Sequence, residues 1–124
     1  MIFPVCYLPA NSTFGVNANI FTPKDDIFWM ISYLNSSLVT YFVRGILIRS
    51  NMVTSGYISQ IPILPFNKNE KHKLTQLSKE VIENKVEINN AINKIDDLVF
   101  NNTGLCMAKI ENIKDFAKNL NKRV

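Results

Sequence analysis

The chain has 124 residues, of which 47% are hydrophobic, and a formal net charge of +4 at pH 7. This length and composition exclude a disordered chain and predict one globular domain, because a chain of this size can bury a substantial core. The mild positive charge is compatible with a nucleic-acid partner. Cys6 and Cys106 lie far apart without a second metal ligand beside either, so zinc is not expected.

Irregular strands are expected at the beginning of the chain, over residues 1–21. The stretches "VCYL" and "VNANIF" are rich in β-branched and aromatic residues, and the turn-forming "PANSTFG" separates them. The first ten residues contain no basic leader, so a signal peptide is not expected.

A helix that is apolar on nearly all sides is predicted over residues 23–45. Thr22 is the expected N-cap, with Pro23 at the first helical position and Asp25 three residues after the cap. Such a helix is buried either in a protein or in a membrane. The polar "LNSSL" near its middle and Arg44 near its end favour the central helix of a folded domain over a membrane span.

A short strand over residues 57–63 is predicted after a polar loop that begins at Arg49. Its β-rich sequence is "YISQIPI", and Pro62 restricts it to the edge or the end of a sheet. The expected fold class is therefore α+β, with a small sheet and a buried helix, followed by a long C-terminal helix and a short terminal helix.

The long helix is predicted over residues 67–102 from a heptad pattern. Gly104 supplies its stop, and a terminal helix follows over residues 107–120. The apolar stripe packs either within the chain or between two chains, in which case residues 67–102 form a homodimer. The first heptad position holds Leu74, Val81, Ile88 and Ile95, and the second holds Leu77, Asn84, Ala91 and Leu98.

Residues for catalysis are not recognisable in the sequence. It has no glycine-rich phosphate loop, no metal-ligand spacing and no Ser/His/Asp set. His72 is expected on the surface, within the polar run "NEKHK". Asp96 and Asp97 are adjacent on a predicted helix and therefore point to different sides, so they do not form an acid/base pair. The chain by itself is not expected to be an enzyme.

Three motifs in a fixed order resemble a known family. They are Leu34-Asn35-Ser36 in the buried helix, Ile61-Pro62-Ile63 in the strand, and "IDDLVFNNTGL" from Ile95 to Leu105. This order resembles the C-terminal specificity region of the TaqI-like adenine-N6 DNA methyltransferases, which include bacterial type IIG restriction–modification enzymes. The resemblance covers residues 16–105.

The resemblance implies a cytoplasmic, non-catalytic module that recognises a specific sequence in double-stranded DNA. Residues 1–66 would be the C-terminal part of a target recognition domain, and residues 67–124 the helical part. S-adenosylmethionine and the chemistry would belong to a methyltransferase or endonuclease domain that is absent from this chain, so no cofactor is expected. Two alternatives stay open: a fragment of a type I restriction specificity subunit, and a coiled-coil interaction module that does not bind DNA.

The loop after the buried helix holds the residues expected to contact DNA. Basic side chains would meet phosphates, and polar side chains would read base edges, with Arg49 suited to guanine and Asn51 to adenine. The predicted DNA-binding residues are Arg44, Arg49, Ser50, Asn51, Thr54, Ser55 and Tyr57.

Overall fold

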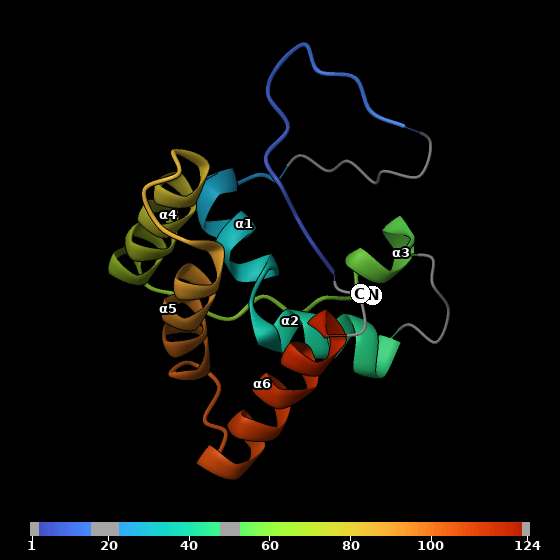
Figure 1. The fold of residues 1–124 in the computed structure, drawn as a ribbon, viewed down its shortest axis with the longest axis vertical. Helices are drawn as coiled ribbons and strands as arrows, with labels where there is room; N and C mark the ends of the chain where they lie inside the picture. The colour runs from blue at the N-terminus through green and yellow to red at the C-terminus, as the bar shows by residue number, and fades with distance from the viewer. Residues whose placement is uncertain (1–2, 16–22, 48–52, 123–124) are drawn as a thin grey trace.

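The computed structural model describes residues 3–15, 23–47 and 53–122, and these residues form helices joined by irregular segments (Figure 1). The helix α1 packs chiefly against α4, and α2 packs against α6. The helices are α1 (Ile27–Leu34), α2 (Ser37–Tyr41), the π-helix η1 (Phe42–Leu47), α3 (Ser55–Ile58), α4 (Lys68–Ile82), α5 (Ile88–Phe100) and α6 (Met107–Asn121).

The predicted α+β class is wrong, because the described part of the chain contains no strand. The predicted strand at residues 57–63 is instead the end of α3, a turn and the start of a segment without regular structure at residues 61–67. Pro62 and Pro65 lack the N–H groups that a sheet ladder needs. The Phe66 N–H donates locally, to the Leu64 oxygen at 2.9 Å, so this segment does not pair with another strand.

The helix expected over residues 23–45 is interrupted, and it begins later than predicted. Asp26 is the N-cap of α1, and its side chain accepts a hydrogen bond from the Phe28 N–H at 2.8 Å; the expected cap, Thr22, lies outside the described residues. The α-helix stops at Asn35, and Ser36 caps α2 by accepting from the Val39 N–H at 3.3 Å. Asn and Ser side chains bond to nearby backbone groups and so favour caps over helix interiors, which explains the break.

The long helix expected over residues 67–102 is also wrong, because a turn divides it into α4 and α5. Asn84 adopts φ 56°, in the left-handed region that asparagine tolerates. Its N–H donates to the Val81 oxygen at 3.0 Å, and the Lys85 N–H donates to the Glu80 oxygen at 2.8 Å. These two bonds form a Schellman motif, which ends α4 and lets the chain turn back into α5.

The heptad stripe is consequently buried within one chain. Leu74 is fully buried and Leu77 and Ile95 are buried beside it in the core. Ile88, at the first position of α5, is 62% exposed. The continuous seam that a homodimer through residues 67–102 would use is not formed. The expectation that Ile88 lies in a packed seam is wrong.

Two serines allow α1 and α4 to approach closely. Ser32 Oγ donates to the Leu74 oxygen at 2.6 Å, and Ser78 Oγ donates to the Phe28 oxygen at 2.6 Å. The two hydroxyl oxygens are themselves 2.6 Å apart. Both serines are buried, so these contacts satisfy polar groups that would otherwise be unpaired in the core.

The terminal helix is confirmed. Predicted over residues 107–120, it is observed as α6, Met107–Asn121. Its apolar face packs on α2, with Ile113 and Ala117 buried and the Phe116 ring 5.3 Å from the Tyr41 ring. Gly104, just before it, has φ 66°, as expected for a glycine that ends the preceding helical segment.

Candidate functional site

The residues predicted to contact DNA fall around η1 and α3 where the structure describes them. Arg44 is half-buried in η1, and Thr54 and Ser55 are exposed where α3 begins. Tyr57 is half-buried and packs against the hydrophobic core. Since α3 contacts η1, these four residues belong to neighbouring elements. The remaining three lie outside the described residues: Arg49, Ser50 and Asn51.

The three motifs that carry the resemblance meet in space. The Tyr33 hydroxyl, beside the first motif, donates to the Pro62 oxygen of the second at 2.5 Å. Ser37, directly after the first motif, donates twice to Asp96 of the third: its N–H to Oδ1 at 2.8 Å and its Oγ to Oδ2 at 2.6 Å. Asn35 binds the N-terminal segment, since its side chain hydrogen-bonds both the N–H and the oxygen of Val5. We name this region the motif junction: Tyr33, Asn35, Ser37, Pro62 and Asp96.

Buried ionisable groups give the motif junction its electrostatics. Burial raises the pKa of Tyr33 to about 12, so its hydroxyl is a protonated donor at neutral pH. Asp96 is 2% exposed, and burial raises the pKa of its carboxyl although the Ser37 hydrogen bonds and Lys114 act in the opposite direction. Asp97 is exposed, which confirms that the two adjacent carboxylates face different sides. The Asp96 carboxylate serves to hold the start of α2.

The raised pKa of Asp96 predicts how the stability depends on pH. A carboxyl whose pKa is higher in the folded state binds its proton more tightly there, so folding is favoured at low pH. Its contribution is complete below the unfolded-state pKa of 3.8 and is lost as the pH rises through the folded-state value. The unfolding free energy of the wild type minus that of Asp96→Asn should therefore fall as the pH rises above 3.8. Urea unfolding at each pH measures this difference.

Asp96→Asn suits this experiment because the amide keeps an oxygen acceptor for the Ser37 N–H and does not titrate. Both proteins have the same exposed carboxylates, so the contribution of these groups cancels in the difference between the two unfolding free energies. A difference that rises with pH would mean that the hydrogen bonds from Ser37 outweigh the desolvation of the ionised carboxylate.

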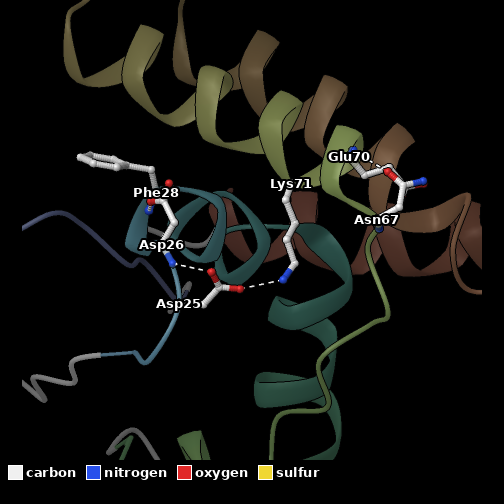
Figure 2. A network of polar contacts seen from close by, with 6 residues as sticks. All are labelled: Asp25, Asp26, Phe28, Asn67, Glu70 and Lys71. Carbon is white, nitrogen blue, oxygen red and sulfur yellow. Dashed lines mark hydrogen bonds and ion pairs between the residues drawn. The ribbon is translucent and has the colours of Figure 1, made fainter.

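An apolar groove of about 640 Å³ lies between α1, α3 and the segment at residues 61–66. Asp25 and Lys71 also line it, and they form an ion pair at 2.7 Å (Figure 2). Most of its remaining lining is hydrophobic and includes Trp29, Met30, Leu34, Ile58, Ile61 and Leu64.

The polar end of the groove is formed by three residues. Lys71 Nζ bonds Asp25 Oδ2 at 2.7 Å and lies 4.7 Å from the centroid of the Trp29 ring. Asp25 Oδ1 accepts from the Asp26 N–H at 2.8 Å, a contact drawn in Figure 2. The hydrogen bond from Lys71 holds the pKa of Asp25 below its ordinary value. We name Asp25, Trp29 and Lys71 the carboxylate clamp.

Sequence reasoning missed the carboxylate clamp. Asp25 was expected in the first turn of a helix, and nothing in the sequence places Lys71 beside it. The two residues are 46 positions apart, and no periodicity relates them. Their only common signal is opposite charge at the beginnings of two predicted helices.

The described residues include no group of three His, Cys, Asp or Glu side chains arranged to hold a metal ion. Cys6 and Cys106 are exposed, free thiols, and His72 is exposed as predicted. Among the helices of the described residues, none combines the length and the apolar character needed to cross a bilayer.

No protein-family model, no curated protein and no solved structure matches the chain.

Proposed function

We propose that this chain is a non-catalytic DNA-recognition module of a bacterial restriction–modification enzyme of the TaqI-like adenine-N6 methyltransferase type. The observation that supports it is the motif junction. Tyr33 bonds to Pro62 and Ser37 bonds to Asp96, so three stretches that resemble one family in sequence are also joined in the fold. These contacts come from Tyr33 and Ser37, which directly flank the first motif, and they reach the backbone of the second motif and the Asp96 side chain of the third.

The proposed DNA surface consists of η1 and α3, together with the residues that link them in sequence. Thr54 and Ser55 expose hydroxyl groups there, and the Thr54 side chain makes no capping hydrogen bond to α3. Arg49 and Asn51 belong to the linking chain and supply the two side-chain types that read guanine and adenine bidentately. The DNA is double-stranded, and a separate methyltransferase or endonuclease domain in the cytoplasm carries S-adenosylmethionine and the chemistry.

The coiled-coil alternative has less support, because Leu74, Leu77 and Ile95 of its apolar stripe are already buried in the core of this chain. A type I specificity subunit remains the nearer alternative and predicts the same dependence on DNA. Recognition would in both cases be separate from catalysis.

DNA binding by the full chain should weaken steeply as salt is added. Each phosphate contact releases counterions, so the slope of log K against log[salt] should be about −0.9 for every phosphate neutralised. Fluorescence anisotropy of a labelled mixed-sequence duplex measures it. No change in anisotropy at low salt would contradict the proposal.

Two variants separate base reading from phosphate contact. Arg49→Ala and Asn51→Ala should each lower affinity for the preferred site by about 1–3 kcal/mol, with little change on other sequences. Lys73→Ala, at an exposed position on α4, should instead weaken binding to all sequences alike or have no effect. Selection from a randomised duplex library reports the preferred sequence for each protein. Undiminished selectivity in both loop variants would show that this loop does not read bases.

A further inference from the structure

The carboxylate clamp contains two donors and a single carboxylate. Lys71, Trp29 and Asp25 all line the groove, and Lys71 Nζ lies 4.7 Å from the centroid of the Trp29 ring. The Asp25 carboxylate is exposed and accepts from Lys71, with its side chain 50% exposed in this ion pair. An exposed ion pair contributes little to stability, so Asp25 is held weakly.

The buried indole N–H of Trp29 supports a ligand site independently of the ion pair. Its side chain is 3% exposed, yet its indole N–H has no hydrogen-bond partner among the described residues. Lys71 Nζ lies 4.7 Å from the centroid of the Trp29 ring and 2.7 Å from Asp25 Oδ2, so the indole lies beside this ion pair. A buried donor that stays unpaired is unfavourable, and an acceptor that enters the groove relieves it.

We propose that the groove binds a small apolar monocarboxylic acid. The carboxylate of the ligand replaces that of Asp25 at Lys71 and accepts a hydrogen bond from the Trp29 indole. The apolar part of the ligand lies along Met30, Leu34 and Ile61, in the hydrophobic length of the groove.

The chemistry of the clamp selects this ligand class. Asp25 shows that a carboxylate fits at Lys71, at 2.7 Å. Lys71 and Trp29 offer only donors, so an alcohol or an amine of the same length gains less there. The volume of about 640 Å³ falls within the range of about 300–1,000 Å³ that small-ligand sites occupy. The groove shares Ser55 and α3 with the proposed DNA surface, but binding of the acid is measured without DNA, so the two proposals are tested separately.

Trp29 makes the binding measurable, because it is the single tryptophan of the chain. Decanoate, 1-decanol and decylamine are titrated into the full chain, and tryptophan fluorescence is recorded. Decanoate should saturate the signal at one molecule per chain and bind at least about tenfold more tightly than decanol, because a hydrogen bond to a charged group is worth more than one to a neutral group. Decylammonium should bind most weakly.

Two substitutions in the clamp have opposite expected effects. Lys71→Met keeps the apolar stem and removes the ammonium group, so decanoate affinity should fall to that of decanol. Asp25→Asn removes the competing carboxylate, so decanoate affinity should rise several-fold. A gain of this kind does not arise from a folding defect. Lys73→Met is the matched control and should change neither affinity, since Lys73 is exposed and does not line the groove.

The proposal is overturned if decanoate fails to saturate, or if decanoate and decanol bind equally. It is overturned as well if Asp25→Asn weakens the binding of decanoate, or if Lys71→Met leaves it unchanged while circular dichroism shows a folded protein. A peptide that carries an apolar residue next to aspartate is the comparison ligand. Saturable binding of that peptide without binding of decanoate would assign the groove to a protein partner and reject the free acid.

Discussion

Replacing Leu74 by alanine is expected to lower the free energy of unfolding by about 2–5 kcal/mol. Leu74 is completely buried on α4, where it belongs to the hydrophobic core that α4 shares with α1. Its backbone oxygen also accepts the hydrogen bond from Ser32, so the chain around it has little freedom to collapse into the cavity. Urea unfolding followed by far-ultraviolet circular dichroism measures the loss.

Ile88→Ala is the matched control. The heptad pattern gives Ile88 the same position as Leu74, but the turn after α4 leaves it 62% exposed. We expect this substitution to change the unfolding free energy by no more than about 0.5 kcal/mol. Equal losses of unfolding free energy in the two variants would indicate that the stripe is one continuous buried seam. That result would contradict the turn at Asn84.

The second large effect is expected from Asp96→Ala. The substitution leaves the N–H and the hydroxyl of Ser37 without their acceptor. Both groups are buried, and both donate to Asp96. Hydrogen bonds to charged groups contribute about 1.5–3 kcal/mol each, and removing a desolvated carboxylate offsets part of that. A net loss of about 2–4 kcal/mol in unfolding free energy is therefore expected from chemical denaturation at neutral pH.

Two further variants show whether the Ser37 contact is responsible. In a double-mutant cycle, Ser37→Ala and Asp96→Ala should be strongly non-additive, because each removes the partner of the other. Asp97→Ala is the control, since Asp97 is exposed and contacts Lys114 only at 3.5 Å. Additive losses from Ser37→Ala and Asp96→Ala would mean that the motif junction is not energetically coupled at this point.

The C-terminal helix was the most predictable part of the fold. The terminal helix has an apolar face that needs only its own periodicity to be recognised, and it was located correctly. Asn84 was identified as a polar defect in the heptads, but the pattern does not reveal backbone φ. The Schellman motif depends on hydrogen bonds from the N–H groups of Asn84 and Lys85 to the last turn of α4. In a continuous helix these two N–H groups would have other acceptors.

The sheet was mispredicted because local β propensity does not guarantee a partner. The stretch "YISQIPI" has the composition of a strand, yet its first residues close a helical turn, with the Ser59 N–H donating to the Ser55 oxygen at 3.1 Å. Propensity for strands is realised only through cross-strand packing, and among the described residues no other segment pairs with this one. Tertiary context therefore decided the outcome.

The two candidate sites differ in how much of each could be predicted from the sequence. The DNA-contacting role of Arg44, Arg49 and Asn51 comes from the resemblance and stays a prediction. The carboxylate clamp was out of reach, because it requires α1 and α4 to be packed before Asp25 and Lys71 meet (Figure 2).

The amide of Asn35 has a consequence for local motion of the chain. It offers Val5 one acceptor at 3.1 Å and one donor at 2.7 Å, as the backbone of a neighbouring strand would. A strand ladder holds its neighbour by many hydrogen bonds, whereas the hydrogen bonds to Val5 come from one side chain, supported by the burial of Phe3 and by the Tyr7 ring 5.6 Å from the Phe28 ring. The N-terminal segment should therefore peel away at a lower free energy than global unfolding requires, so the Val5 amide should exchange its hydrogen sooner than the amides inside α4.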